Sequence, residues 1–269
     1  MTDKVFSLQQ GSSPLLVSMP HIGTIIPPEL LPSYVPRALD VEDTDWHLHL
    51  LYGFLQGMGA SVLQPQVSRY VIDLNRPPDD APMYPGASNT ELCPTRFFTG
   101  EALYQSGQEP TAEERARRRD LYWQPYHDAL ASELARIRAV HGFALLWDAH
   151  SIRSHIPWLF EGRLPDLNIG TASGTSADQA ITDAVVAACA DWPHVSTAVN
   201  GRFKGGYITR HYGQPASNVH AVQLEMCQSL YMQESLPFAY DAVLAAKIQP
   251  LLIKMISGAL SACKSHHEN

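Results

Sequence analysis

The sequence predicts an α/β fold, in which helices on both faces of a mixed, mostly parallel central sheet make a three-layer sandwich. Short apolar runs of strand length alternate along the chain with longer runs of helical composition. The run FALLWD, at 143–148, is apolar up to its last residue, as expected of a central strand that is covered on both faces. Strands that alternate with helices favour a parallel sheet with helices packed on both sides.

The first 110 residues predict three strands, one helix and one long loop. The run PLLVSMPH, at 14–21, predicts a strand that ends before a proline-rich loop, because proline cannot donate to a strand ladder. Apolar spacing over 41–55 predicts an amphipathic helix. The runs ASVLQPQ, at 60–66, and SRYVIDLNR, at 68–76, predict two further strands. The stretch 79–110, rich in proline, glycine and aspartate, predicts a long functional loop.

The rest of the chain continues the alternation. A helix is expected to begin at Thr111, and Pro125 should kink or divide it because proline disrupts the helical hydrogen-bond pattern. The further expected elements are strands over 143–148, 194–200 and 220–226 and helices over 176–191 and 238–263. The chain has 269 residues, 45% of them hydrophobic, with no internal repeat and no linker composition, so we expect a single domain over residues 1–269.

Composition limits the expected cellular compartment of the protein and the kinds of partner that it can bind. The four cysteines lie far apart without a CxxC pair, which is typical of a reducing cytoplasm and favours neither disulfides nor a thiolate zinc site. The N-terminus lacks a basic segment followed by an apolar one, and no stretch approaches the roughly 20 apolar residues of a membrane span. The formal net charge of −8 argues against a nucleic-acid partner. We therefore expect a soluble, cytoplasmic protein that binds a small molecule and neither membranes nor nucleic acid, with its oligomeric state left open.

Ionisable residues stand at the ends of three expected strands. His21 follows the first, Asp148 and His150 follow FALLW, and Glu225 lies near the end of HAVQLEM. In open α/β sheets the ligand crevice lies beyond the carboxyl ends of the strands, so these side chains should converge. An isolated carboxylate at such a place costs several kcal/mol unless it is paired or binds a metal.

A metal site would account for these residues. Two histidines, His21 and His150, and one carboxylate can hold Zn²⁺ and leave a fourth position for water. Asp148 is suited to accept the other N–H of a metal-bound imidazole, and Glu225 to take a proton from the water. The alternative for Asp148 and His150 is a structural pair at a strand end, and for His21 a hydrogen-bonded loop histidine.

The sequence leaves the carboxylate ligand open between two aspartates. Asp43 and Asp45 both fall in the first turn of the expected 41–55 helix, where an acid is also favoured by the helix dipole. His49 lies one helical turn beyond Asp45, so these two can instead form a structural contact.

Arginines suggest the substrate class, because their planar guanidinium binds carboxylates with two hydrogen bonds. Arg69 precedes the third expected strand, and Asn75 and Arg76 follow it. Arg153 follows the DAHS turn and is a candidate to stabilise an oxyanion. Tyr207 and Arg210, in the glycine-rich stretch GGYITRHYG, are further candidates for substrate binding. The alternative is a set of ordinary surface arginines.

Six ordered blocks resemble the N-formylglutamate amidohydrolases, over roughly residues 14–235. The blocks are PHIGTIIPPEL, DTDWHLH, SRYVIDLNRPPDD, LWDAHSIRSHIPWLFEGRLPDLNIGT, GGYITRHYG and VQLEM. The resemblance implies a single catalytic domain that hydrolyses N-formyl-L-glutamate to formate and L-glutamate in histidine degradation. It also implies one divalent metal ion, Zn²⁺, and a fold similar to that of the zinc carboxypeptidases and phosphorylase/hydrolase-like proteins.

The resemblance also implies roles for residues. His21 and His150 match the metal histidines, and Glu225 matches the general base. The carboxypeptidase pattern has a glutamate three residues after its first histidine, where this chain has Thr24, so we choose Asp45 of the DTDW block as the carboxylate ligand. The carboxylate-binding residues of the wider fold resemble Arg69, Asn75 and Arg76.

Two rival functions remain at this point. One is a related zinc amidohydrolase that acts on another N-acyl amino acid or on a C-terminal peptide. The other is a non-catalytic protein that binds acidic amino acids through the same arginines. The second has no evident need for two histidines and a glutamate at converging strand ends.

Overall fold

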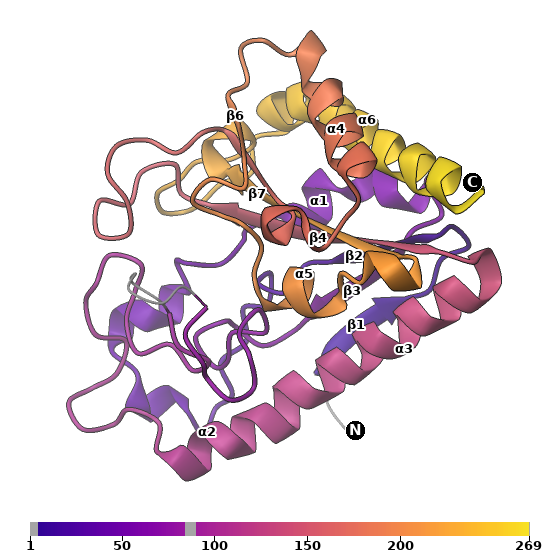
Figure 1. Cartoon of the computed structure of the whole chain (residues 1–269). Helices are drawn as coiled ribbons and strands as arrows, with labels where there is room; N and C mark the ends of the chain where they lie inside the picture. The colour runs from indigo at the N-terminus through magenta and orange to yellow at the C-terminus, as the bar shows by residue number, and fades with distance from the viewer. Residues whose placement is uncertain (1–4, 84–89, 269) are drawn as a thin grey trace.

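A computed structural model of the chain describes residues 5–83 and 90–268. Its described residues form a seven-stranded sheet with the strand order β1-β3-β2-β4-β7-β5-β6 (Figure 1). The strands are β1 (Phe6–Gln9), β2 (Leu15–Ser18), β3 (Ser61–Pro65), β4 (Ala144–Ile152), β5 (Leu167–Gly170), β6 (Thr197–Val199) and β7 (Val219–Cys227). The pairs β3·β2, β2·β4, β4·β7 and β5·β6 are parallel, whereas β1 and β5 pair antiparallel to their neighbours β3 and β7. The predicted mixed, mostly parallel sheet is confirmed.

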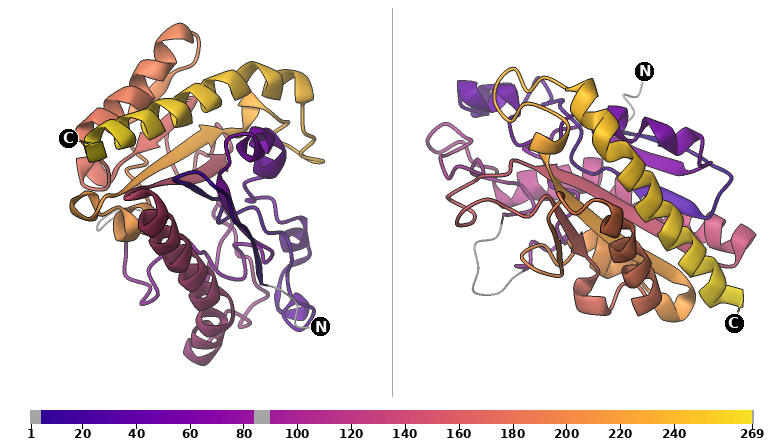
Figure 2. Two further views of the ribbon diagram at one scale, coloured as in Figure 1. Left: turned by 90° about the vertical axis from the view of Figure 1, so that its right-hand side faces the viewer. Right: turned by 90° about the horizontal axis from the view of Figure 1, so that it is seen from above.

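Helices cover both faces of the sheet. They are α1 (Leu48–Leu51), α2 (Ala112–Arg118), α3 (Gln124–His141), α4 (Gln179–Ala188), α5 (Tyr207–Tyr212) and α6 (Ala242–Glu268). The turned views show α4 and α6 on one side of the sheet and α3 on the other (Figure 2). The three-layer arrangement expected from the alternation of strands and helices is confirmed.

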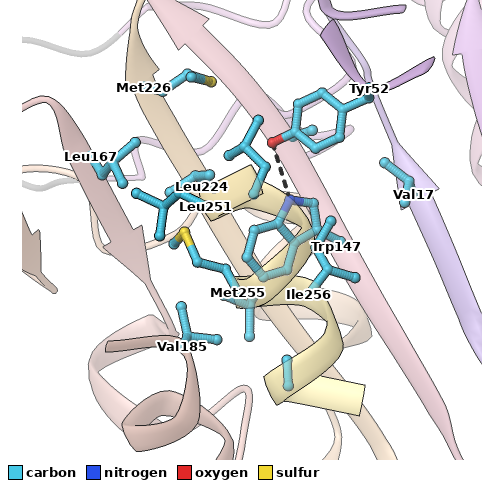
Figure 3. Packing of buried hydrophobic residues seen from close by; sticks show 14 of the residues in the cluster. Val17, Tyr52, Trp147, Leu167, Val185, Leu224, Met226, Leu251, Met255 and Ile256 are labelled. Atoms are coloured by element: carbon cyan, nitrogen blue, oxygen red, sulfur yellow. Dashed lines mark hydrogen bonds between the residues drawn. The ribbon is translucent and has the colours of Figure 1, made fainter. Parts of the chain in front are cut away.

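The residues of β4 alternate between two apolar cores, as the two-residue period of a strand requires. Leu145 and Trp147 pack with α1, α4 and α6, while Leu146 packs with α3 on the opposite face. Trp147 lies against residues of α6, including Met255 and Ile256, and its indole N–H donates to the Tyr52 hydroxyl at 3.3 Å (Figure 3). Burial on both faces explains the continuous apolar run, because neither face of this strand meets water.

Two predicted elements of the N-terminal half are wrong. The helix expected over 41–55 is reduced to the single turn of α1 and a following 3-10 turn, and Val41 and His47 have positive φ. The strand expected over 68–76 is a series of turns whose apolar side chains fill the core beneath α3. In both segments polar side chains point into the protein. A regular helix or strand would not direct these side chains inward, so the segments are irregular. The strands β1 and β5 and the helix α5 were not predicted from the sequence.

The predicted division of the 111–142 helix is confirmed. Thr111 caps α2, and its side chain accepts a hydrogen bond from the backbone N–H of Glu114 at 3.2 Å. A π-helical turn, Arg119–Trp123, separates α2 from α3, which has Pro125 in its first turn. The chain stays helical through this turn, so the π-helical residues mark the place where the helix accommodates the proline, which has no N–H to bond to the preceding turn.

The C-terminal helix α6 is the one described helix that is long and apolar enough to cross a membrane, by length and composition only. The sequence did not predict a stretch of this kind. One side of α6, including Leu251, Leu252 and Met255, is fully buried in the core against the sheet and α4. Helices in protein cores can be equally long and apolar, so these two properties alone do not indicate a membrane span.

The buried histidine of α3 predicts a pH-dependent stability. His127 stacks on Trp123 at 3.7 Å between ring centroids, and its Nε2 lies 2.9 Å from the carbonyl oxygen of Leu74. Burial lowers the pKa of His127 to about 3, against the opposing effect of that hydrogen bond. Since the unfolded chain protonates His127 near its ordinary pKa and the folded chain does not, the free energy of unfolding should fall as the pH drops from about 6.5 towards 3, by at most about 1.4 kcal/mol per pH unit.

Urea denaturation between pH 4 and 7 tests this expectation. Replacement of His127 by Gln should reduce the pH dependence of the unfolding free energy by that slope, whereas the same replacement of the exposed His155 should leave it unchanged. Equal slopes in the wild type and the His127→Gln variant would show that this histidine does not contribute.

Candidate active site

The candidate site lies at the C-terminal ends of β4 and β7. These strands pair in parallel with His150 opposite Glu225, and the chain leaving β2 brings His21 to the same edge. A cavity of about 270 Å³ opens there. Its lining includes His21, Arg69, Asn75, Arg76, His150 and Glu225. The convergence expected at the carboxyl ends of parallel strands is present.

His21, Asp45 and His150 form a possible metal-binding group. The Nδ1 atoms of the two histidines are 3.1 Å apart, and Asp45 Oδ2 lies 3.2 Å from His150 Nδ1 and 3.5 Å from His21 Nδ1. Four ligand atoms bound tetrahedrally to zinc at their usual bond lengths lie about 3.3–3.6 Å from one another. The three side chains are buried and fit one small cation of this kind.

Two further aspartates contact the Nε2 atoms of the two histidines. Asp73 Oδ1 is 2.7 Å from His21 Nε2, and Asp148 Oδ2 is 3.0 Å from His150 Nε2. A carboxylate acceptor favours the proton on Nε2, so the Nδ1 lone pairs of both rings face each other and Asp45. A positive charge favours this arrangement of lone pairs and a carboxylate; the Arg69 guanidinium, with Nη1 3.2 Å from His21 Nδ1, supplies one, and the three ligand atoms could hold a metal ion as well.

The charges of the group perturb its acids and bases. Burial alone would raise the pKa of Asp45, but the facing imidazoles of His21 and His150 outweigh it and hold that pKa below its ordinary value. Asp73 behaves likewise, since His21 and neighbouring arginines lower its pKa against the effect of burial. Both carboxyl groups are therefore ionised and available as acceptors at neutral pH.

The structure separates Asp45 from Asp43. The carboxylate of Asp43 faces away from the histidines and accepts hydrogen bonds from the Tyr70 hydroxyl and the Phe98 backbone N–H, both at 2.9 Å. Arg153 Nη2 donates to its other oxygen at 2.7 Å. Asp43 thus has a structural environment, and Asp45 alone of the pair points at the histidines. Neither lies in the first turn of a helix.

Glu225 lines the cavity beside the metal-binding group and is 8% exposed. Burial raises its pKa to about 8; the His150 imidazole acts against this, while the charges of Asp45 and Asp148 act with it. A carboxyl group whose pKa lies near neutrality can both accept and return a proton. This is the behaviour expected of a general base that later acts as an acid.

The predicted substrate-binding residues divide into two sets. Arg69, Asn75 and Arg76 line the cavity. Arg153 is held by Asp43 outside the cavity lining, so the structure does not bring this proposed oxyanion residue to Glu225.

The two candidates from GGYITRHYG do not line the cavity either. Tyr207 begins helix α5 and stacks on His211 at 4.9 Å between ring centroids. Arg210 lies on the exposed side of that helix, and its Nε donates to the Gly205 carbonyl oxygen at 2.8 Å. Gly206 and Gly213 flank the helix, and of this stretch Gly206 lines the cavity.

Several residues at the site were not indicated by the sequence, among them Asp73, Gln223, Arg202 and Phe203. Asp73 was hidden within a run that predicted a strand, whereas Gln223, Arg202 and Phe203 line the cavity from β7 and from the segment after β6. A carboxylate in an apolar run, in DLNR, was the available signal for Asp73. Arg202 and Phe203 lie in the stretch GRFKGGYITRHYG, whose glycines are typical of an active-site loop but also of a surface hairpin, so the sequence did not single out these two residues.

Comparison with known proteins identifies the family of the chain. The model of the family described as N-formylglutamate amidohydrolase matches residues 13–232. The chain belongs to this family. It is 51% identical over 259 residues to the N-formylglutamate deformylase of Pseudomonas aeruginosa, which covers 96% of this chain and 97% of the relative. The N-formylglutamate deformylase of Pseudomonas putida is 50% identical over the same shares.

Solved structures support the fold of this amidohydrolase. The N-formylglutamate amidohydrolase from Ralstonia eutropha JMP134 aligns with a TM-score of 0.79 at 22% identity, covering 97% of each chain. A gene product of Agrobacterium tumefaciens aligns with a TM-score of 0.72 at 20% identity, over 96% of this chain and 95% of that one. The predicted family and fold class are confirmed.

A second group of possible metal ligands in the amidohydrolase lies at the opposite end of β7. It comprises Asp178, His220 and His266. His266 Nε2 is 2.9 Å from Asp178 Oδ2, and the backbone N–H of Asp178 points at His220 Nδ1 at 3.4 Å. That contact favours the proton on His220 Nε2, the nitrogen nearer the carboxylate, so the group is best described as a polar contact that ties α6 to the start of α4.

Proposed function

We propose that the protein hydrolyses N-formyl-L-glutamate to formate and L-glutamate, as a cytoplasmic enzyme of histidine degradation that uses one divalent metal ion. The names of the Pseudomonas relatives support the substrate. The observation that carries the proposal is the convergence of His21, Asp45 and His150 beside Glu225 in a cavity that arginines line. We expect no nucleic-acid or membrane partner, in keeping with the net charge of −8 and the buried side of α6.

His21, Asp45 and His150 would hold the ion, which we take to be Zn²⁺, while Asp73 and Asp148 fix the orientation of the imidazoles. A divalent ion bound there would polarise the formyl carbonyl and lower the pKa of a water molecule. Other first-row divalent ions suit the same ligands, so the choice of zinc rests on ligand type and spacing.

The side chains of the cavity account for the movement of protons. Glu225 would accept a proton from the water that attacks the formyl carbon and return it to the amide nitrogen as the C–N bond breaks, releasing formate and the amine of glutamate. Arg69 Nη1 lies 3.2 Å from His21 Nδ1, so its guanidinium reaches the reacting centre and can donate to the oxyanion. This role replaces the one that the sequence suggested for Arg153.

Steady-state formate release tests the proposal. The purified protein should release formate from N-formyl-L-glutamate and lose this activity on chelation, and N-acetyl-L-glutamate or a C-terminal peptide should be poorer substrates. Full activity in a preparation shown to be free of metal would exclude the metal's role. Preference for another N-acyl amino acid would favour the related amidohydrolase, and tight glutamate binding without turnover would favour a binding protein.

A further inference from the structure

Three arginines line the cavity, and they differ in their partners. Arg69 is buried and pairs with Asp73 at 2.7 Å. Arg76 donates from Nε to the carbonyl oxygen of Thr90 and from Nη1 to that of its neighbour Asn75, both at 2.9 Å. Within residues 5–83 and 90–268, no carboxylate lies within ion-pair distance of the third, Arg202. Its charge is therefore the one most available to a ligand.

The fold holds Arg202 over the cavity. Segment 200–206 leaves the edge strand β6 and crosses β5 towards β7, with a backbone hydrogen bond from Asn200 to β5 at 2.8 Å at one end. At the other end the Gly206 N–H donates to Gln223 Oε1 at 2.7 Å. A side chain at Gly206 would collide with Asn75, so the glycine permits this close approach. Hydrogen bonds at both ends hold the backbone of the segment that carries Arg202.

Aromatic rings position the guanidinium without neutralising it. The Arg202 guanidinium carbon lies 5.6 Å from the ring centroid of Phe160 and 6.0 Å from that of Phe203. Both rings pack against a small apolar cluster that includes Ile152 and Ile156 and borders the cavity. Cation–π contacts of this kind orient a cation and leave its N–H groups free to bind an anion.

The substrate offers two carboxylates at different distances from the bond that breaks. The α-carboxylate is attached to the carbon that bears the amide nitrogen, so it must lie near the metal-binding group, where Arg69 and Asn75 contact His21 and His150. The side-chain carboxylate is separated from that carbon by two methylene groups and can reach a more distant wall. Arg202 lines the same cavity from an exposed position, whereas Arg69 is buried beside the histidines.

We propose that Arg202 binds the side-chain carboxylate of the N-formylated substrate and thereby selects glutamate over uncharged side chains. This inference rests on the proposed function, since it assigns the ligand of the same cavity. Phe160 and Phe203 act as positioning residues for the arginine. A bound carboxylate would be held by two charge-assisted hydrogen bonds at a site that is partly removed from water.

The test compares Arg202→Met with the wild type on N-formyl-L-glutamate and on N-formyl-L-glutamine, which has nearly the same shape without the charge. The variant should lose about 10- to 100-fold in kcat/KM for the glutamate compound, chiefly through KM, and change less than about threefold for the glutamine compound. Arg202→Lys should retain part of the preference. Lys204→Met removes an exposed cation from the same segment and should leave both values unchanged.

The outcomes separate this inference from the proposed function. If the wild type releases no formate from N-formyl-L-glutamate, the proposed function fails. The assignment of the side-chain carboxylate is overturned if the wild type is active and Arg202→Met loses kcat/KM equally on both compounds. It is also overturned if Arg202→Met instead loses the preference of the wild type for N-formyl-L-glutamate over N-formyl-L-isoglutamine, which lacks the α-carboxylate. If the variant is inactive on every compound, calorimetry of L-glutamate and L-glutamine binding decides. A ratio of the two Kd values equal to that of the wild type contradicts the proposal.

Discussion

Replacement of Glu225 by Gln should lower kcat for formate release by about 10²–10⁴-fold, the usual range for the loss of a general acid–base group. Glutamine keeps the shape of the side chain but cannot accept the proton of the attacking water. The side chain of Glu225 makes no hydrogen bond to the part of the chain that the structure describes, so the replacement should leave the fold intact. We therefore expect an unchanged melting temperature and KM, which distinguishes lost chemistry from lost binding.

Three measurements make the Glu225 result specific. Metal content should equal that of the wild type, because Glu225 is not among the three residues of the metal-binding group. A Glu109→Gln variant, altered at an exposed carboxylate, should keep the wild-type kcat. A Glu225→Gln enzyme with normal metal content and near wild-type kcat would require another base, and no other glutamate lines this cavity among the described residues.

The sequence predicted those parts of the fold in which local pattern and tertiary position agree. β4 and β7 are buried on both faces, so their continuous apolar runs were sufficient to identify them. The run SRYVIDLNR has a similar composition but forms turns, because Arg69, Asp73 and Asn75 are fixed by contacts with His21 and His150. Local propensity cannot report such long-range contacts, and tertiary structure overrides it here.

The site residues also divide into those that the sequence predicts and those that depend on the finished fold. His21, His150 and Glu225 follow from their places at strand ends, where the topology of a parallel sheet brings them together. Asp73 and Arg202 come from loops whose paths depend on the finished fold. Arg153 and Arg210 were plausible by residue type, but their guanidinium groups bind Asp43 and Gly205 within the protein. Residue type alone does not distinguish an arginine committed to the structure from one that faces a ligand.

Replacement of Asp45 by Asn should weaken metal binding by more than about 100-fold, which exceeds the effect usual for residues that only orient a ligand. The carboxylate supplies the negative charge that two neutral imidazoles lack, and a neutral amide oxygen binds a divalent ion much less tightly. The expected readout is the Kd for Zn²⁺ from competition with a chelator, and formate release should fall in parallel unless zinc is added in excess.

Asp43 provides the matched control, because it is the neighbouring buried aspartate that the sequence could not separate from Asp45. Asp43→Asn should keep the zinc Kd within a few-fold of the wild type but lower the free energy of unfolding, since it removes the charge that pairs with Arg153 at 2.7 Å. The replacement leaves Arg153, which is partly exposed, with the more distant carboxylate of Glu42 at 3.5 Å, so the cost should be smaller than the roughly 3–5 kcal/mol of a broken buried pair. The reverse pattern, with zinc binding lost in Asp43→Asn and kept in Asp45→Asn, would transfer the ligand role to Asp43 and contradict the geometry of the two histidines.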